Sequence, residues 1–514
     1  MSELQNFALM NPISMITGKE REEFTREDML KVIIEKQIER ITFHYTALDG
    51  RIKELRIPVT SRNQAELILT EGERVDGSSL FKGIVDAGKS DLYVVPVYRT
   101  AFFNPFDDKS LDFICRFLDR DGNRASFAPD NILHNAHSLL KSNTGFELHA
   151  LGELEFYLIG NHEHELYPMA KQKGYHGSAP FIKSGEILNE ILSHITKITG
   201  NIKYAHYEVG HITKLQSDFE ELNGKTAEQV EVEFLPTNIE DTADIVVLSS
   251  WIIRNVAYRH GFVATFFPKL EIGHAGNGMH FHMMLQKDGK NMMVNNDGTL
   301  SEESHKLIGG LCQYASSLTA FGNTVSASYL RLVPNQEAPT KVCWSEMNRS
   351  AMIRVPLAWS NVSNLNQVVN PQQKDKLEQQ ESRQTVEIRS PDGSAHVHPL
   401  LAGITMAAEW GLTKADESLP LCKNSYVKGN IHASPSSEDL AEIATSCVES
   451  AEMLLQHKNL FTRQNVFPER LIEHTATNLQ NENDRNLNKR LMALPEEEML
   501  YESRRIMHRR IHKY

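Results

Sequence analysis

Cysteine is scarce in this chain, and its placement argues against a disulfide-stabilised secreted domain. The 514 residues contain five cysteines, and no two of them are spaced as a C-x-x-C pair. An odd, scattered set of this kind is typical of reduced thiols. The first 18 residues contain Glu3 and no basic flank before an apolar block, so a secretory signal is not expected. We therefore expect a cytoplasmic protein.

Long hydrophobic runs and glycine-rich phosphate loops are also missing. The longest apolar stretches, such as 92–98 and 245–253, are far too short to cross a bilayer, so no membrane association is expected. Neither the Walker A pattern G-x-x-x-x-G-K-[ST] nor the G-x-G-x-x-G fingerprint occurs. Any phosphate group bound by this chain would therefore have to be held by cations and arginines.

Basic residues are outnumbered by acidic ones. Lys and Arg total 54 against 67 Asp and Glu, which gives a formal net charge of −13. Because affinity for nucleic acids comes mainly from neutralising phosphates, a chain this acidic is a poor candidate for a nucleic-acid binder. The surplus of carboxylates is instead compatible with binding cations.

Composition and periodicity predict a globular protein with more than one domain. Hydrophobic residues make up 40% and charged residues 24%, and domains of roughly 100–200 residues would allow two to four. Thr25 and Asp28 form the pattern of a capping box before a helix. Alternating segments on both sides of the turn 48–51 predict a β-hairpin inside a mostly β unit that ends near residue 125.

Beyond residue 126, strand-like and helical segments alternate. The expected strands are 147–159, 203–210, 231–234, 262–267, 280–285 and 385–389. The expected helices are 131–142, 184–200, 241–260, 301–321 and 400–411, and the chain from 437 onward is nearly all helical. The polar segment 212–227 is expected to be a loop.

Four of the expected strands carry ionisable side chains at positions i and i+2, which point to the same face of a strand. Glu153 and Glu155 lie inside an apolar run, where two carboxylates repel each other unless a proton or cation lies between them. The other pairs are His280 with His282, Glu231 with Glu233, and Glu387 with Arg389. Any one pair could be a solvated polar face. Taken together, carboxylates with an imidazole suit Mg²⁺ or Mn²⁺ rather than zinc.

Three arginines form a second group of candidates. Arg331, Arg349 and Arg354 occur within 24 residues of each other. Guanidinium groups match carboxylate and phosphate oxygens with two parallel hydrogen bonds. Arginines near metal-binding carboxylates are what phosphoryl transfer requires, whereas surface salt bridges are the alternative.

Nine segments, in order along most of the chain, resemble the motifs of the glutamine synthetase family in its shorter, bacterial-type class. They are Asp76–Ser79, Gly152–Phe156, His206–Val209, Gln229–Glu231, Ala264–Lys269, Gly276–His282, Arg331–Pro339, Asn348–Arg354 and Val386–Asp392. The resemblance implies an α+β fold, in which a small β-grasp domain precedes a large α/β catalytic domain whose curved sheet forms an open barrel. It implies a helical extension over 1–35, the β-grasp domain over 36–125 and the catalytic domain over 126–514.

The same resemblance implies two or more divalent ions, Mg²⁺ or Mn²⁺, in each site. One ion would be held by Glu155, Glu208 and Glu231, and the second, beside the phosphates of ATP, by Glu153, His280 and Glu387. The assignment of Glu231 requires an insertion within 210–228.

The remaining roles are also carried over from the family's motifs. Substrate-binding residues would be Gly276, Tyr175, Arg331 and Arg389, and nucleotide-binding residues would be His282, Arg349 and Arg354, with Arg349 also catalytic. Glu337 resembles the flap glutamate that closes the site and takes a proton from the attacking amine. Asp76, contributed by a neighbouring subunit, would help to deprotonate ammonium, with Tyr175 in the same pocket.

The implied activity is ATP-dependent ligation of L-glutamate and ammonia to L-glutamine through γ-glutamyl phosphate. The implied assembly is a ring-shaped homo-oligomer, a dodecamer of two hexameric rings, with active sites between subunits. Two alternatives stay open. A related ligase would join glutamate to a larger amine, which Ala275 in place of the usual asparagine allows. A non-catalytic family member would be expected to have lost metal ligands, and all six are present.

Overall fold

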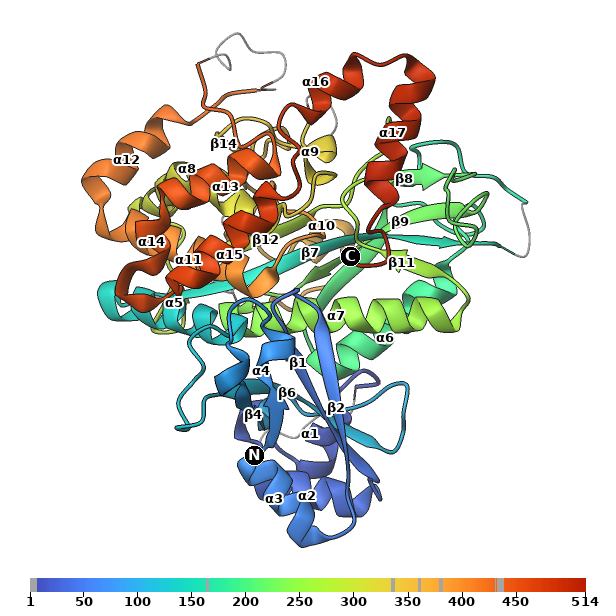
Figure 1. Ribbon diagram of the computed structural model, residues 1–514, viewed down its shortest axis with the longest axis vertical. Helices are drawn as coiled ribbons and strands as arrows, with labels where there is room; N and C mark the ends of the chain where they lie inside the picture. The colour runs from blue at the N-terminus through green and yellow to red at the C-terminus, as the bar shows by residue number, and fades with distance from the viewer. Residues whose placement is uncertain are drawn as a thin grey trace.

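The computed structural model describes residues 7–162, 166–333, 338–358, 362–378, 382–429, 431 and 439–514. Figure 1 shows a small unit, coloured blue, below a larger unit that runs from cyan to red. Each unit is built around its own β-sheet. Among the described residues, no helix is both long and apolar enough to cross a membrane.

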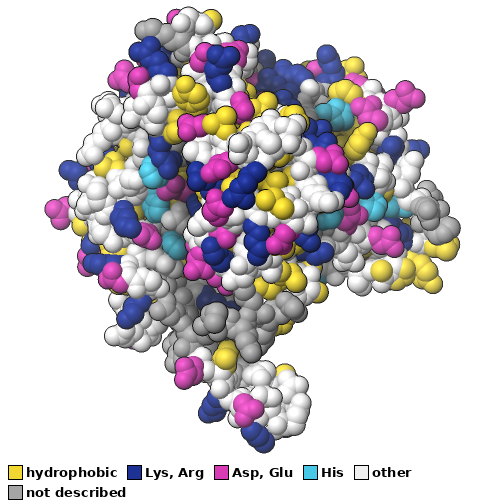
Figure 2. All heavy atoms as spheres, turned by 90° about the horizontal axis from the view of Figure 1, so that it is seen from below, with side chains coloured by type: hydrophobic (Ala, Val, Ile, Leu, Met, Phe, Trp, Pro, Cys, Tyr) yellow, Lys and Arg dark blue, Asp and Glu magenta, His cyan; other side chains and the backbone are white. Residues whose placement is uncertain are grey.

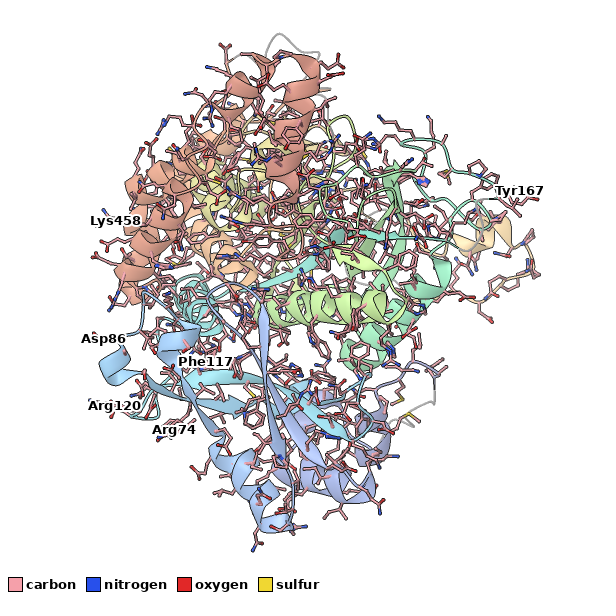
Figure 3. The ribbon with its side chains drawn as sticks, turned by 45° about the vertical axis from the view of Figure 1, so that its right-hand side comes forward. Arg74, Asp86, Phe117, Arg120, Tyr167 and Lys458 are labelled. Carbon is pink, nitrogen blue, oxygen red and sulfur yellow. The ribbon has the colours of Figure 1, made fainter. Side chains whose placement is uncertain are left out.

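The small unit contains a mixed sheet with the strand order β2-β1-β6-β4-β3, and β5 pairs with β6. Its strands are β1 (Arg40–Thr46), β2 (Ile52–Pro58), β3 (Glu73–Asp76), β4 (Asp91–Pro96), β5 (Phe102–Phe103) and β6 (Ser110–Leu118). Its helices are α1 (Pro12–Thr17), α2 (Arg26–Glu35), α3 (Arg62–Glu71) and α4 (Gly77–Leu80), with 3-10 turns η1 (Arg21–Glu23), η2 (Ala87–Lys89) and η3 (Tyr98–Thr100). Figure 3 shows Phe117 inside this unit and Arg74, Asp86 and Arg120 toward its outside.

Two local predictions are confirmed in the small unit. Strands β1 and β2 form the expected antiparallel hairpin, and Gly50 in its turn has φ +75°, a conformation that glycine adopts without strain. Helix α2 begins directly after Thr25, whose hydroxyl accepts from the backbone N–H of Asp28, while the Asp28 carboxylate accepts from that of Thr25. This reciprocal cap satisfies two backbone donors that the first turn leaves unpaired.

The large unit contains an open sheet with the order β14-β15-β16-β12-β7-β9-β8, and β10, β11 and β13 pair at its sides. Its strands are β7 (Glu147–Gly160), β8 (Ile202–Ile212), β9 (Thr226–Phe234), β10 (Thr237–Asn238), β11 (Val263–Thr265), β12 (Met279–Lys287), β13 (Lys290–Asn291), β14 (Trp344–Glu346), β15 (Ile353–Val355) and β16 (Val386–Ile388). All six strands expected from the sequence are present. Strand β9 begins five residues earlier than expected because its first residues already pair with β7 and, from Ala227, with β8.

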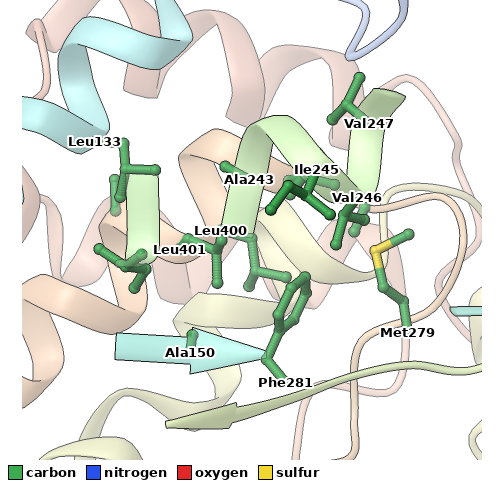
Figure 4. Close-up of a cluster of buried hydrophobic side chains, with 14 of the residues drawn as sticks. Leu133, Ala150, Ala243, Ile245, Val246, Val247, Met279, Phe281, Leu400 and Leu401 are labelled. Carbon is green, nitrogen blue, oxygen red and sulfur yellow. The ribbon is translucent and has the colours of Figure 1, made fainter. Parts of the chain in front are cut away.

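The helices of the large unit lie in several places around this sheet: in Figure 1, α6 and α7 run beneath it, α8 and α11 to α15 gather at the left, and α17 lies at the upper right. They are α5 (Pro129–Thr144), α6 (Gly185–Thr199), α7 (Ile239–Arg259), α8 (Glu302–Gly322), α9 (Ser328–Arg331), α10 (Asn366–Val369), α11 (Val397–Thr413), α12 (Ala415–Asn424), α13 (Cys447–Gln456), α14 (Lys458–Thr462), η6 (Arg463–Asn465), α15 (Glu469–Gln480), α16 (Leu487–Met492) and α17 (Glu496–His508). Figure 4 shows Ala150 of β7 and Phe281 of β12 packed against side chains of α7 and α11.

The segment between β8 and β9 is the predicted loop, and it docks on the C-terminal helix α17. The side chains of Gln216 and Arg504 form a hydrogen bond of 2.8 Å, and His512 Nε2 lies 3.0 Å from Glu221 Oε1. Leu215 and Leu222 are fully buried in a small core shared with Met507. The loop is therefore packed against the rest of the large unit and contributes to its core.

The two units meet through a buried ionic contact. Arg116 of β6 forms a two-pronged ion pair with Asp244 of α7, and His398 Nε2 of α11 lies 3.1 Å from the same carboxylate. Arg116 Nε lies 3.7 Å from Asp130. Two carboxylates and a histidine of the large unit thus surround one guanidinium of the small unit.

The surface of the molecule carries charges of both signs. Figure 2 shows basic and acidic side chains interspersed on the face in view.

Candidate active site

The ionisable pairs found in the sequence all lie on the face of the large sheet that points away from α7. On β12, Met279 and Phe281 point toward α7 in Figure 4, so His280 and His282 point the other way. On β7, a side chain at Gly152 would meet Val246 of α7, which places Glu153 and Glu155 on the opposite face. The period-two pattern therefore puts imidazoles and carboxylates on the same side of neighbouring strands.

Strand register brings the first group together. Glu153 pairs with His280 across β7 and β12, and His282 pairs with Glu387 across β12 and β16. His280 Nδ1 and His282 Nε2 both lie 2.9 Å from oxygens of Glu153. The Glu387 carboxylate lies 3.7 Å from His280 and 3.9 Å from His282. Both histidines are buried, so this corner is largely shielded from solvent.

A second group forms where β7, β9 and β8 meet. Glu155 pairs with Glu231, and Glu231 pairs with His206. His206 Nε2 lies 3.0 Å from Glu231, and its Nδ1 lies 3.8 Å from Glu208. Glu155 accepts hydrogen bonds from the N–H of Gly278 and from the Gln229 side chain.

The electrostatics of the two groups differ in sign. Burial penalises the charge of Glu153, but His282 and His280 beside it outweigh that penalty and hold its pKa well below the usual value. The pKa of His282 is raised, because Glu153 and Glu387 outweigh the effect of its burial. For Glu231, burial and repulsion from Glu153, Glu155, Glu208 and Glu233 all act in one direction and raise its pKa well above the usual value. Negative charge is therefore under-compensated around Glu231.

Such crowding fits a divalent cation. Three sets of residues among those described each offer three ligand atoms that lie within 4.8 Å of one another. The sets are Glu153–Glu231–His280, Glu153–His282–Glu387 and His206–Glu208–Glu231. Carboxylate oxygens with imidazole nitrogens are ligands that Mg²⁺ and Mn²⁺ accept.

The arginines line the same site from its other side. Arg354 Nη1 donates to Glu387 at 2.9 Å, and Arg389 Nε donates to the other oxygen of Glu387 at 3.1 Å. Arg331 is buried, donates to the carbonyl of Ser390 at 3.0 Å, and lies 3.3 Å from His280 Nε2. Burial is the main reason that the pKa of Arg331 is lowered from its usual value.

Arg349, Tyr175 and Gly276 also lie near the carboxylates. Arg349 is exposed, and its pKa is raised because Tyr175, Glu387 and neighbouring carboxylates outweigh its desolvation. The Tyr175 ring lies 5.6 Å from the ring of His206. A side chain at Gly276 would come within 3.0 Å of Arg331, so this loop passes close to the guanidinium stem.

Two predicted residues are not joined to this site within the chain. Asp76 is exposed at the start of α4, and its carboxylate accepts from Ser78 and Ser79, which lowers its pKa to about 2. No hydrogen bond or ion pair among the described residues links Asp76 to the carboxylates of the large sheet. Glu337 lies outside the described residues.

His206 and Gln229 were not predicted from the sequence to be site residues, and His282 was predicted only to bind the nucleotide. His206 and Gln229 each occur inside segments that had been singled out, so the available signal was their i and i+2 spacing with Glu208 and Glu231. Because register across strands is non-local, only the folded sheet shows that His206 faces Glu231 and that His282 joins Glu153 and Glu387.

The comparisons with known proteins agree with this geometry. A family model described as the catalytic domain of glutamine synthetase matches residues 126–490, and a second, the beta-Grasp domain of glutamine synthetase, matches 37–120. The chain belongs to the glutamine synthetase family. It is 31% identical to a glutamine synthetase of Pyrococcus horikoshii over 402 residues, covering 77% of this chain and 78% of that one. It is 32% identical to that of Halobacterium salinarum over 390 residues, covering 74% and 76%.

Solved structures are similar over almost the whole chain. The cryo-EM structure of Plasmodium falciparum glutamine synthetase has a TM-score of 0.71 and 21% identity, covering 90% of this chain and 97% of that one. A GmaS–ADP complex has a TM-score of 0.69 and 19% identity, covering 91% and 97%. At these identities the likeness concerns the fold. The predicted α+β architecture, with a β-grasp domain before a curved catalytic sheet, is confirmed.

Proposed function

We propose that this glutamine synthetase family member is an ATP-dependent ligase that joins L-glutamate and ammonia into L-glutamine through γ-glutamyl phosphate. One observation carries the proposal. A single sheet face gathers Glu153, Glu231 and Glu387, each within a three-residue group able to hold a cation, beside the arginines that pair with Glu387. That is the arrangement needed to gather phosphates and a carboxylate substrate in one site.

The carboxylates and histidines would hold Mg²⁺ or Mn²⁺. When bound, these ions would offset the negative charge of ATP and of the phosphoryl group in transfer. We assign Glu155, Glu208 and Glu231 to one ion and Glu153, His280 and Glu387 to the other. His206 lies beside Glu208 and Glu231 of the first set, and His282 lies beside Glu153 and Glu387 of the second. Each histidine could add a nitrogen ligand or orient a carboxylate.

The arginines would bind the anionic parts of the substrates. Arg331 and Arg389 would hold the glutamate and the phosphoryl oxygens, and Gly276 would allow backbone to approach the amino acid. Arg349, Arg354 and His282 would line the nucleotide side, with Arg349 also close enough to stabilise charge in transfer. In the described structure Arg354 and Arg389 both pair with Glu387, so these pairs would be exchanged when substrate and cation enter.

Ammonium must lose a proton before it can attack an acyl phosphate. Asp76 of a neighbouring subunit, Tyr175 and Glu337 would form this pocket, and the carboxylates would first stabilise the cation and then accept its proton. The exposure of Asp76, with no partner on the large sheet among the described residues, supports completion by a second subunit. A cytoplasmic, ring-shaped homo-oligomer, such as two stacked hexamers, would complete every site in this way.

A ligase for a larger amine is the second candidate, and a stack of rings favours it. The ring of His176 lies 4.4 Å from Tyr175 and 4.5 Å from His206, and Tyr204 lies 5.8 Å from His206. Aromatic faces beside carboxylates attract an alkylammonium as well as a bare ammonium.

Release of phosphate from ATP by the purified protein distinguishes the two candidates. The assay contains glutamate, Mg²⁺ or Mn²⁺, and either ammonium or one of a panel of amines such as methylamine, ethanolamine and putrescine. We expect turnover with ammonium to exceed that with each amine, and glutamine to form in step with phosphate. Faster turnover with one of the amines would identify that amine, instead of ammonia, as the substrate. Absence of glutamate-dependent phosphate release would refute the proposed function.

A further inference from the structure

A cavity of about 220 Å³ lies behind the catalytic sheet, on the side away from the carboxylates. Segments distant in sequence line this partly open cavity, among them the β1–β2 hairpin (Asp49–Ile52), helix α7, and the residues Lys513 and Tyr514. Figure 1 shows this hairpin reaching α7, with the C-terminal end of the chain close to the same helix. At about 30 Å³ per water molecule, the volume corresponds to roughly seven waters or one small metabolite.

Cations dominate the polar lining of this cavity. Arg51, Arg254 and Lys513 line it, and among the described lining residues Asp49 alone has an acidic side chain. Asp49 is already engaged by two cations, because its Oδ2 lies 3.3 Å from Arg51 Nε and 2.8 Å from Lys53 Nζ. The lining therefore carries an excess of positive charge.

Arg254 is the least compensated of these cations. Its guanidinium lies 4.7 Å from the centre of the Phe266 ring, and it forms no hydrogen bond or ion pair with any other described residue. Burial, followed by repulsion from Arg51, lowers its pKa to about 10. Arg254 is half-buried, and because a guanidinium held against apolar groups without an acceptor loses part of its hydration, an anionic partner would be favourable here.

Apolar side chains form much of the remaining lining, together with Ser250 and Asn255. The apolar side chains of the walls are those of Trp251, Phe266, Met279, Val247 and Val397. A guanidinium pair offers parallel donors to a carboxylate or a phosphate, and the apolar walls suit a short hydrocarbon body. We propose that this cavity is a second binding site, for a small organic anion with a carboxylate or phosphate group held by Arg254, Arg51 and Lys513.

The cavity and the active site are connected through residues that are adjacent along the chain. Met279 directly precedes His280, and Gly393 directly follows Asp392, which bridges to Gly278. An anion in the cavity would touch the reverse side of these strand ends without entering the carboxylate cluster. The proposal is therefore independent of which amine the ligase uses.

Binding is tested directly by calorimetry and by the thermal midpoint of the assembled protein. The probes are succinate, glutarate, glyceraldehyde 3-phosphate and inorganic phosphate, with neutral glutaramide as the uncharged control. We expect at least one organic anion to bind and to raise the midpoint, glutaramide to do neither, and the phosphate and carboxylate probes to separate the two possible acid groups. Absence of binding by every organic anion would overturn the proposal.

Variants locate the site. Arg254→Met should weaken the binding of that anion by at least about tenfold, while the exposed Arg51→Gln should weaken it by a smaller factor. Arg259→Gln, on the same helix but stacked on Phe106, and Arg389→Gln in the candidate active site should both leave it unchanged. Loss in Arg389→Gln with retention in Arg254→Met would place the anion in the active site and refute the proposal. So would equal loss in Arg259→Gln.

The midpoint without ligand separates a binding role from a structural one. Since Arg254 is half-buried without an anionic partner among the described residues, the apolar Arg254→Met side chain should keep or raise the thermal midpoint of the free protein. A large drop in this variant, together with unchanged anion binding in Arg51→Gln, would mean that the guanidinium only supports packing on Phe266.

Discussion

His280 and Glu153 face each other across β12 and β7, and the imidazole Nδ1 lies 2.9 Å from the carboxylate. The same carboxylate also receives His282 at 2.9 Å through its other oxygen. Glu153 is thus shared between two histidines, whereas Glu231, on the neighbouring strand β9, lies close to four other carboxylates. This asymmetry places the strongest demand for a cation around Glu231.

Replacing Glu231 should therefore stabilise the metal-free protein. Glu231→Gln removes a buried charge that four carboxylates repel, and we expect a gain on the order of 1 kcal/mol in the free energy of unfolding. The stabilisation that Mg²⁺ or Mn²⁺ gives to the wild type should be lost. Thermal melts with EDTA and with each metal measure both effects.

Glu228→Gln is the matched control on the same strand. Glu228 is also buried, but it accepts from the Ser184 hydroxyl and from two backbone N–H groups. This substitution should destabilise the protein and leave its metal response in place. If Glu231→Gln destabilised the metal-free protein as Glu228→Gln does, Glu231 would be a satisfied structural residue.

The raised pKa of Glu231 also predicts a pH dependence. A carboxyl whose folded pKa lies above its ordinary value of 4.5 contributes stability that is present below 4.5 and is lost as the pH rises through the folded pKa. Without metal, the wild-type midpoint should therefore fall above pH 4.5 more steeply than that of Glu231→Gln. If the thermal midpoints of the wild type and of Glu231→Gln changed in parallel from pH 4 to 8, the ionisation of Glu231 would not be the cause of this pH dependence.

Glu387→Gln tests the second ion and the arginine pairs at once. Removing this charge leaves Arg354 and Arg389 without their carboxylate and removes a ligand, so glutamate-dependent phosphate release should fall by at least about a hundredfold. Circular dichroism and size-exclusion profiles should stay close to those of the wild type. Near-normal turnover would refute the role of Glu387.

Asp76→Ala and Glu387→Gln proteins should complement each other. Each should be nearly inactive alone, because one lacks the amine pocket and the other a cation ligand. Co-assembled rings should regain activity, since some interfaces would join an intact β-grasp domain to an intact carboxylate cluster. Mixed rings without recovered activity, or a fully active monomer at high dilution, would exclude a shared site.

Glu337→Ala tests the proposed flap. Without this carboxylate the acyl phosphate would be left open to water, so glutamine synthesis should be lost while some glutamate-dependent ATP hydrolysis remains. Measuring glutamine and phosphate in the same reaction gives their ratio directly. A wild-type ratio would remove Glu337 from the mechanism.

The contact between the two units should be sensitive to acid. Arg116 and His398 outweigh burial and lower the pKa of Asp244 to about 2, so its contribution is present above the ordinary 3.8 and is lost as the pH falls through about 2. Asp244→Asn should cost about 2 kcal/mol at pH 7. Asp241 lies on the same helix as Asp244 and forms a partly exposed ion pair with Arg99 of the small unit. Asp241→Asn should therefore reduce the free energy of unfolding by less than Asp244→Asn. Equal costs in denaturant titrations would contradict this assignment.

Local patterns in the sequence were sufficient to predict the helices and strands and to predict which side chains share a face of each strand. The capping box at Thr25, the turn at Gly50 and the alternation around Glu153 and His280 depend on neighbours within a few residues, so periodicity alone predicts them. Family membership also followed from the ordered motifs. The assignment of individual roles to Asp76, Glu337 and the metal ligands stays a prediction.

Only the tertiary structure decided which of these faces meet. Glu153 finds His280 127 residues away, and Arg116 finds Asp244 128 residues away, through pairings whose register no local signal encodes. The same holds for His206 against Glu231, for the 213–225 loop on α17, and for the cavity between the hairpin, α7 and the chain end. Sequence period determines where a side chain points, whereas long-range strand pairing and helix packing determine what it touches.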